Sequence, residues 1–346
     1  MAGGLTAAEL ERRLAAFPRL RYAGLPTPLE ELGRLSSQLG GPRLWIKRDD
    51  GFGPGLGGNK GRALEFFMAD LLRKGQRKAV TFGSLQSNHA RMTAAACAQV
   101  GVEAHLLFFA RRPPHPEGNL LLDALFGAHM HYIPFGGGGD GSMTLETTNR
   151  LVRLVARLWV GRDAYFIPVG GHHVTGCLGY VAAAAEIQAQ AASLGLPPAR
   201  TTVVMAAGTG STLAGMLAGF YLLRSPIRVL GLDVENLWKG FPASVARLAG
   251  ALCATLGEER RFRPEEIPLL GGPSPDHGDG RLAANFRSAI RLMAQSEGIV
   301  LDPVFTGKAF AGLLELIDRG EFGEEEHVIF LHTGGLPSLW ACGDPL

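Results

Sequence analysis

A lysine follows a glycine-rich loop at the predicted start of a helix. Residues 49–60 read DDGFGPGLGGNK, and apolar residues at helical spacing begin directly after Lys60. An amine at a helix N-terminus lies at the positive end of the helix dipole, which disfavours its protonated form. An amine that loses its proton easily is suited to covalent chemistry with carbonyl groups. The alternative interpretation is an ordinary surface lysine beside a loop.

A second glycine-rich segment follows the β-branched run Thr202–Ala206 and opens a helix. Its residues are Gly208, Thr209, Gly210, Ser211 and Thr212. Backbone N–H groups and hydroxyls at a helix N-terminus favour an anion, and phosphate in particular. The segment lacks the Gly-Lys-Ser/Thr ending of a P-loop, and its glycine spacing does not match the dinucleotide fingerprint. The alternative is a tight turn without a ligand.

A third loop places polar side chains at the start of the helix expected at Asn88–Val100. They are Ser84, Gln86, Ser87, Asn88 and His89. Unpaired N–H groups at such a helix start would hold a substrate carboxylate. Ser87 and Asn88 are also common capping residues, so a purely structural role is the alternative.

Short apolar strands alternate with helical patterns along the chain, which predicts an α/β fold with mostly parallel sheets flanked by helices. Helix-start signals at Thr6 with Glu9, and at Thr27-Pro28 with Glu30, predict two helices near the N-terminus. The expected strands are Leu44–Lys47, Ala79–Phe82, Ala104–Phe109, His131–Ile133, Tyr165–Pro168, Thr202–Ala206, Val229–Val234, Ile299–Val304 and Val328–His332. The expected helices beyond the first two are Gly61–Lys74, Asn88–Val100, Leu145–Trp159, Cys177–Ala191, Thr212–Leu223, Ala243–Leu256, Leu282–Ser296 and Lys308–Ile317.

Length and composition restrict the class of protein. A chain of 346 residues is long enough for two domains, and 46% hydrophobic with 19% charged residues excludes extensive disorder. A net charge of +2 gives no sign of a nucleic-acid partner. The sequence contains no run of about 18 apolar residues that would predict a membrane span, and its N-terminus does not resemble a signal peptide. We therefore expect a cytoplasmic protein. The cysteines lack a CxxC pair, and we expect no metal site, no disulfide framework and four buried thiols: Cys97, Cys177, Cys253 and Cys342.

Five motifs occur together in one order: GGNKGRALE at residues 57–65, QSNHAR at 86–91, the glycine and threonine loop, DPVFTGKA at 302–309 and HTGG at 332–335. From about Leu25 to Gly335 the chain resembles the 1-aminocyclopropane-1-carboxylate deaminase / D-cysteine desulfhydrase family. The resemblance implies a tryptophan-synthase-β-like fold, fold type II of the enzymes that use pyridoxal 5'-phosphate. It further implies a large domain of residues 1–60 plus 169–346, a small domain of residues 61–168, an active site between them and a homodimer.

The resemblance also implies residue roles. Lys60 would bind the cofactor covalently and later move protons, and Asn88 would contact the cofactor's 3-oxygen. Residues 208–212 would hold the phosphate, and Thr333 would be the neutral partner of the pyridine nitrogen. The expected catalytic residues are Lys60, Ser87 and His277, and the expected contacts to a small amino-acid substrate are Ser84, Gln86, Ser87, His89 and Phe305.

One position favours a branch of that family. The deaminases carry a glutamate after the aromatic residue of the DPV motif, where this chain has Thr306. A hydroxyl does not keep a proton on the ring nitrogen as a carboxylate does, so the cofactor is a weaker electron sink. We therefore expect elimination of a good leaving group from a β-substituted alanine, giving pyruvate and ammonia, as in D-cysteine desulfhydrase.

Two departures leave the substrate open. Phe305 and His277 stand where the family usually has tyrosines, and His172 replaces a serine. His277 would act as an acid or base, or as a cation facing an anionic leaving group, or only as a structural residue. The alternatives are therefore desulfonation of L-cysteate, ring opening of 1-aminocyclopropane-1-carboxylate, or a non-catalytic protein that binds the cofactor or an amino acid.

Overall fold

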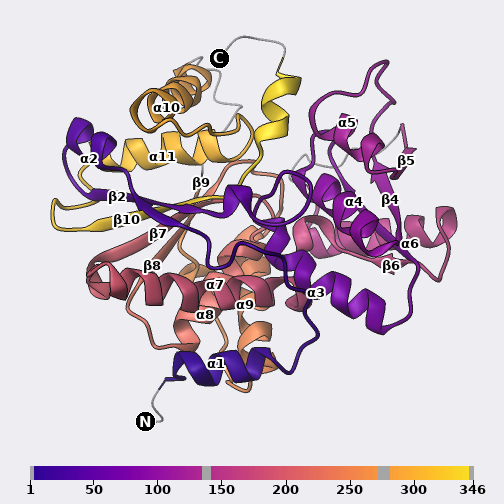
Figure 1. Cartoon of the computed structure of the whole chain (residues 1–346), viewed down its shortest axis with the longest axis horizontal. Coiled ribbons are helices and arrows are strands. Elements are labelled where there is room, and N and C mark those ends of the chain that lie inside the picture. Colours follow the sequence, from indigo (N-terminus) through magenta and orange to yellow (C-terminus); the bar gives the residue numbers. More distant parts are fainter. Residues whose placement is uncertain (1–3, 135–141, 272–280, 343–346) are drawn as a thin grey trace.

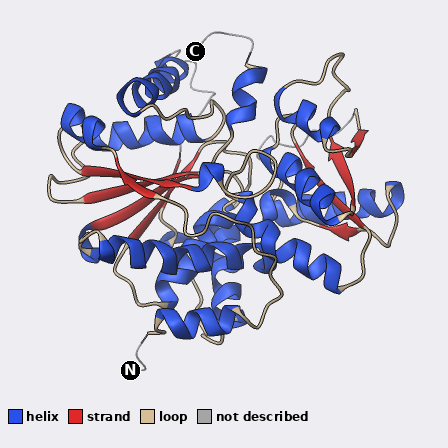
Figure 2. Cartoon of the chain, in the orientation of Figure 1, coloured by secondary structure: helices blue, strands red, loops and turns tan. Residues whose placement is uncertain are grey.

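The computed structural model describes residues 4–134, 142–271 and 281–342, whose strands form two separate sheets (Figure 2). The larger sheet has the order β1-β2-β10-β7-β8-β9 and the smaller one β5-β4-β3-β6. Strand β1 is antiparallel to β2, and the other neighbours are parallel. The strands are β1 Leu29–Glu31, β2 Arg43–Arg48, β3 Lys78–Gly83, β4 Glu103–Phe108, β5 His129–Tyr132, β6 Tyr165–Phe166, β7 Thr201–Ala207, β8 Arg228–Asp233, β9 Leu269–Gly271 and β10 His327–His332.

Helices cover both faces of the larger sheet (Figure 1). Helices α1, α7, α8 and α9 contribute to the core on one face, and α2, α10 and α11 to the core on the other. Helices α3, α4, α5 and α6 pack around the smaller sheet. Their bounds are α1 Ala7–Leu14, α2 Gly33–Leu39, α3 Lys60–Arg73, α4 Asn88–Val100, α5 Gly118–Leu125, α6 Leu145–Trp159, α7 Val174–Ser193, α8 Ser211–Leu222, α9 Phe241–Thr255, α10 Arg281–Glu297 and α11 Thr306–Asp318.

The central strands of the larger sheet explain why it is mostly parallel and covered on both sides. Every residue of β7 and of β10 is buried, so neither strand alternates between core and solvent. Continuous apolar strands of this kind require helices on both faces, which the crossover connections supply. The strands of the smaller sheet all come from residues 78–166, and those of the larger sheet come from both sides of that range. The two-domain division at 60/61 and 168/169 stays a prediction.

Two predicted elements are wrong. Thr27 does not start a helix, because its hydroxyl donates to Asp49 (2.8 Å) and its N–H to Glu186 (2.9 Å), and the chain continues into β1. Segment 299–304 is not a strand, because the Asp302 carboxylate accepts the N–H groups of residues 304–306 and begins α11 instead. The short elements β1, β9 and α5 were not predicted, whereas the capping box of Thr6 and Glu9 is confirmed.

The cysteine prediction holds for Cys97, Cys177 and Cys253, which are buried, but is wrong for Cys342, which is exposed. Cys342 follows the last helical turn of the described chain, where no further element covers it. Among the described residues, no helix combines the length and the apolar character that a membrane crossing requires.

Candidate active site

The three glycine-rich and polar loops meet in one cavity, with empty space of about 850 Å³ including its open mouth. Most of the sequence-predicted site residues line it: Lys60, Ser84, Ser87, Asn88, His89, Gly208, Thr209, Gly210, Ser211, Thr212, Phe305 and Thr333. These residues follow strands of both sheets, at the carboxyl ends where parallel sheets bind ligands. The cavity also includes residues that are not among the predicted site residues: Asn59, Val169, Gly170, Ala206, Glu235 and Leu237.

Lys60 is the first residue of α3, and within the described chain its amine makes no hydrogen bond or ion pair. Burial lowers the pKa of Lys60 to about 8, an effect that Cys177 and Glu235 partly oppose. The direction agrees with the sequence-based expectation, although burial rather than the helix dipole is the leading cause. A neutral amine is therefore accessible near physiological pH.

A buried ionic network fixes the helix that carries Lys60. Arg62, two residues further along α3, donates to both oxygens of Asp49 (2.7 and 2.8 Å) and to both of Glu186 (3.0 and 2.9 Å). Lys47 donates to Glu186 at 2.5 Å, and Tyr180 donates to Asp49 at 2.6 Å. Two cations and two anions therefore balance inside the protein, and α3 is joined to β2 and α7.

Asn88 is oriented by a second buried network. Asn119, fully buried in α5, donates to Asn88 Oδ1 at 2.9 Å and accepts from Arg91 Nε at 2.8 Å. Because the Asn88 oxygen is occupied, its amide nitrogen remains free to donate into the cavity. The fixed orientation suits a residue that must hold an anionic or phenolic oxygen.

The structure differs from the prediction at Gln86, which does not line the cavity. Its side-chain oxygen accepts the Asn119 N–H (2.9 Å) and its amide donates to the Glu117 carbonyl (3.1 Å). Gln86 therefore caps the first turn of helix α5 and supports Asn119. Both ends of its side chain are occupied by these hydrogen bonds. His277 lies outside the described residues, so its role stays a prediction.

Ser87 and His89 lie at the start of α4. The Ser87 hydroxyl accepts the Ala90 N–H at 3.1 Å, so it is a helix cap and a cavity residue at once. His89 Nε2 lies 3.0 Å from Thr81 Oγ1, whose hydroxyl donates to the Ile167 carbonyl. Burial, followed by the charge of Lys60, lowers the pKa of His89 to about 3, so this histidine is neutral.

The loop before α8 is held by neighbours on both sides. Gly210 has a φ of +73°, and a Cβ there would approach Val245 to 2.5 Å, so only glycine fits. His172 Nδ1 donates to the Thr209 carbonyl at 2.7 Å, and Trp238 donates to the Gly208 carbonyl at 2.9 Å. The first-turn N–H groups of α8 have no intrahelical acceptor, so they remain available to an anion.

Hydroxyl groups complete this loop. Thr209 Oγ1 and Ser211 Oγ lie 2.9 Å apart, and Ser211 donates to the Gly170 carbonyl at 2.9 Å. Thr212 accepts the Asn59 amide at 3.0 Å, which leaves its own hydroxyl proton to donate. The loop therefore offers both backbone and side-chain donors.

Two threonines near the end of the chain have different surroundings. Thr333 lines the cavity, and its hydroxyl has no hydrogen-bond partner among the described residues. Thr306 is fully buried, donates its hydroxyl to Asp302 at 2.6 Å and does not line the cavity. Of these two threonines, Thr333 is the one that presents its hydroxyl to a ligand in the cavity.

Glu235 brings a carboxylate into the cavity that the sequence analysis missed. A Cβ on Gly208 would lie 2.6 Å from its Oε2 and 3.0 Å from the Phe305 ring, so the absence of a side chain at Gly208 leaves room for both. Burial raises the pKa of Glu235 to about 7, an effect that Lys308 partly offsets. The position of Glu235 after β8 could have predicted its place in the cavity, because that strand also ends at this edge of the sheet.

Comparison with known proteins identifies the family. The family model described as pyridoxal-phosphate dependent enzyme matches residues 20–334. The chain belongs to this family. This pyridoxal-phosphate dependent enzyme is 37% identical to a D-cysteine desulfhydrase of Yersinia pestis (strain Pestoides F), over 96% of this chain and 98% of the relative. It is 35% identical to a putative 1-aminocyclopropane-1-carboxylate deaminase of Pyrococcus horikoshii, over 96% of each chain.

Solved structures give the same result for the fold. A homologue of ACC deaminase superposes with a TM-score of 0.83 at 33% identity, covering 97% of each chain. An L-serine ammonia-lyase from Rhizomucor miehei superposes with a TM-score of 0.61 at 18% identity, over 91% of this chain and 96% of that one, which shows the shared fold alone. The predicted fold type II architecture is confirmed.

The residues present fit pyridoxal phosphate. The Lys60 amine, which has no partner in the part of the chain that the structure describes, lies in the cavity, as a covalent bond to an aldehyde requires. The loop before α8 provides the donors that a phosphate needs, and Asn88 and Thr333 offer a donor and a neutral hydroxyl. The enzyme is thus a pyridoxal-phosphate dependent lyase whose relatives include desulfhydrases and deaminases.

Proposed function

We propose that this enzyme is a D-cysteine desulfhydrase-like lyase that removes the β-substituent of a small β-substituted alanine. With cysteine and one water, the products are pyruvate, ammonia and hydrogen sulfide. The carbon–sulfur bond breaks, and the sulfur leaves with the bonding pair and takes up a proton. The names of the relatives at 37% identity support D-cysteine as the substrate.

The observation that carries this choice is the environment of Thr306. It stands where the deaminases that this chain resembles carry a glutamate, and it is buried and bonded to Asp302. That position therefore supplies no carboxylate for a ring nitrogen, and the neutral hydroxyl of Thr333 takes that place. A weaker electron sink suits a good leaving group such as a thiol better than an unactivated carbon ring.

Each proposed role follows from a contact of this chain. When bound, pyridoxal phosphate stabilises the negative charge that develops at the substrate Cα. Lys60 binds the cofactor and, as a neutral amine, accepts the proton from that carbon. The loop of residues 208–212 holds the phosphate, and Asn88 donates to the cofactor's 3-oxygen through the nitrogen that Asn119 leaves free.

The substrate carboxylate is proposed to bind at the start of α4. The Ser87 and Ser84 hydroxyls donate to it, together with the first-turn N–H groups of the helix. His89 is neutral and shapes this end of the cavity. The Phe305 ring provides an apolar contact near the β-substituent, where a tyrosine hydroxyl would be expected from the resemblance.

Glu235 argues against L-cysteate as the preferred substrate. Its carboxylate lies beside Phe305 and has no hydrogen bond from the described residues. A sulfonate would bring a permanent negative charge into the same cavity, and two like charges in a poorly solvated site repel each other. A thiol is neutral when it binds, so cysteine avoids this repulsion.

A product screen tests the proposal. Purified holoenzyme is incubated with D-cysteine, L-cysteine, L-cysteate and 1-aminocyclopropane-1-carboxylate, and pyruvate and 2-oxobutanoate are measured separately. We expect pyruvate from D-cysteine at the highest kcat/KM. Formation of 2-oxobutanoate as the main product would favour the deaminase alternative, and a bound cofactor without turnover of any substrate would favour a non-catalytic protein.

We also propose that the enzyme forms a homodimer and acts in the cytoplasm. Exposed leucines along α6 support a second copy as their partner. A cytoplasmic location agrees with reduced thiols at all four cysteines, since no disulfide joins those of the described chain. Fractionation of cells that produce the protein tests the location.

A further inference from the structure

Histidines gather at the edge of the smaller sheet, away from the cavity. Strand β5 is an edge strand, paired in parallel with β4, and His105 lies directly opposite His129. Glu103 precedes His105 by two residues, and His131 follows His129 by two, so the side chains of each strand share one face. The sheet therefore places one carboxylate and three imidazoles side by side.

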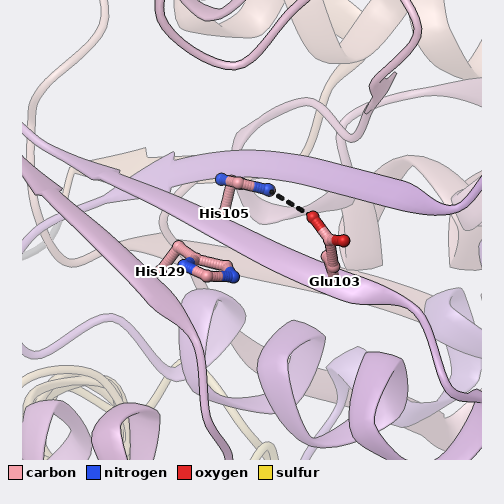
Figure 3. A group of neighbouring side chains, drawn as sticks. All are labelled: Glu103, His105 and His129. Carbon is pink, nitrogen blue, oxygen red and sulfur yellow. Dashed lines mark hydrogen bonds and ion pairs between the residues drawn. The ribbon is translucent and has the colours of Figure 1, made fainter.

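The side chains are close enough to bind one ion. One ligand atom each from Glu103, His105 and His129 lies within 4.8 Å of the others, and Figure 3 shows the three side chains on the neighbouring strands. His105 Nε2 is 3.4 Å from Glu103 Oε2. Ligands about 2.0–2.1 Å from a tetrahedral zinc ion lie about 3.4 Å from each other, so this pair already has the required separation.

The remaining ligand needs only a small rearrangement. The rings of His105 and His129 are stacked, with centroids 4.7 Å apart. His129 is exposed, so rotation about its side-chain bonds meets little obstruction and turns a ring nitrogen toward the other two ligands. Glu103 is also exposed and is free to follow.

His131 orients the central ligand. Its Nε2 lies 3.1 Å from His105 Nδ1, and its ring packs edge-on against Trp159. A metal-binding histidine usually donates its second ring N–H to a fixed acceptor, which sets the tautomer and points the other nitrogen at the ion. With His131 as the acceptor, His105 presents Nε2 to the side where Glu103 lies.

We propose that Glu103, His105 and His129 form a divalent transition-metal site that binds Zn²⁺. Two imidazoles and a carboxylate are a donor set typical of zinc with an open fourth position, which solvent fills at this exposed edge. The ion would tie edge strand β5 to β4 and so stabilise the smaller sheet. The site is independent of the proposed lyase reaction.

Zinc binding by tag-free holoenzyme tests the proposal. The background variant Cys342→Ser removes the exposed thiol, which would otherwise bind the metal. Competition with a chromophoric chelator measures the affinity. We expect the parent protein to bind one equivalent of zinc. Its affinity for zinc should fall at least about 100-fold in His105→Ala, His129→Gln and Glu103→Gln, because three ligands act on one ion. His115→Ala is the matched control, since His115 is an exposed loop histidine outside the group, and it should retain full affinity.

Folding and coordination are checked separately. His129 is an exposed edge residue, so His129→Gln should keep the zinc-free melting temperature and lose only the increase that zinc causes. X-ray absorption at the zinc edge should show scattering from two imidazoles. The proposal is overturned if the three ligand variants bind zinc as the parent does, if His115→Ala loses affinity equally, or if the spectrum shows no imidazole.

Discussion

Lys60 and Glu235 are two titratable groups that face one cavity, and their pKa values are shifted in opposite directions. Burial lowers the pKa of the lysine and raises that of the glutamate, so both change charge close to neutral pH. Perturbed groups that converge in a cavity are typical of active sites. Each shift gives a measurable pH dependence at the scale of a single residue.

The first prediction concerns capture of the cofactor. Only the neutral amine bonds with an aldehyde, so cofactor-free enzyme should recombine with pyridoxal phosphate about tenfold faster per pH unit until the pKa of Lys60, about 8, is reached. An ordinary lysine would give a rise that continues beyond pH 10. Stopped-flow absorbance measures the rate.

Lys60→Ala is the control for that experiment. It should remain folded and bind the cofactor only reversibly, so borohydride should attach no cofactor mass to the protein. Retention of covalent labelling or of full lyase activity in this variant would show that another amine performs the chemistry.

The second prediction concerns substrate charge. Glu235→Gln removes the negative charge beside Phe305, so the ratio of kcat/KM for L-cysteate over D-cysteine should rise about tenfold, which is about 1.4 kcal/mol. Since the carboxylate is charged above its pKa of about 7, the native enzyme should discriminate against L-cysteate more strongly at pH 8 than at pH 6.

Glu259→Gln is the matched control, because Glu259 is exposed and does not line the cavity. It should leave the ratio unchanged. An unchanged ratio in Glu235→Gln as well would mean that this carboxylate does not approach the β-substituent.

At the scale of elements, helix α3 is positioned by charges rather than by apolar contacts alone. Although burial by itself would raise the pKa values of Asp49 and Glu186, Arg62 lowers both through its charge and hydrogen bonds. A buried charge that loses its partner is strongly destabilising, because the remaining ion has neither water nor a counter-ion. Lys60 depends on this network, since it begins the same helix.

The third prediction follows from that network. Arg62→Met should lower the free energy of unfolding by about 3–5 kcal/mol, because buried Asp49 loses the cation that pairs with it and Glu186 keeps only Lys47. Arg319→Met is the control: Arg319 pairs with Glu315 on the surface of α11, and its loss should cost about 0–1 kcal/mol. Urea unfolding of the cofactor-free proteins measures both values.

The same network has a defined pH dependence. The pKa values of Asp49 and Glu186 are lower in the folded protein than in the unfolded chain, so their contribution is present above the usual carboxyl pKa of about 4. It is lost as the pH falls further through the folded values. In Arg62→Met this loss in acid should be much smaller; an unchanged acid transition would contradict the proposed coupling.

At the scale of the whole molecule, helix α6 packs against the smaller sheet (Figure 1). The leucines on its other face form an apolar stripe that no other element of the described chain covers. Leu151, Leu154 and Leu158 recur at helical spacing, and Leu158 is 76% exposed. Single exposed leucines are common, but a row on one helix face is typical of a contact with another chain. The proposed homodimer would cover this stripe.

The fourth prediction tests that interface. Leu154→Glu combined with Leu158→Glu should convert a dimer into a monomer in light scattering coupled to gel filtration, without loss of helical circular dichroism. Leu194→Glu, on an exposed leucine at the end of α7, is the control and should stay dimeric. A monomeric native protein, or a dimeric double variant, would contradict the prediction.

Local sequence determined the loops and most of the elements. Gly210, Ser211 and Thr212 follow a β-branched strand, and Lys60 follows a glycine loop, so near neighbours are sufficient to predict a turn, a helix start and a set of donors. The motifs also determined the family, because their order is retained. Strand β1 was missed and segment 299–304 was wrongly predicted as a strand, since contacts of Thr27 and Asp302 replaced the local preferences.

Tertiary structure decided which side chains support the site. Asn119 orients Asn88 from 31 residues away, and Arg62 reaches Glu186 across 124 residues. No local pattern reports such contacts, because they depend on how strands and helices pack after the chain has crossed between sheets. Glu235 likewise became a cavity residue only because parallel strands end at a common edge, where burial then changes its charge.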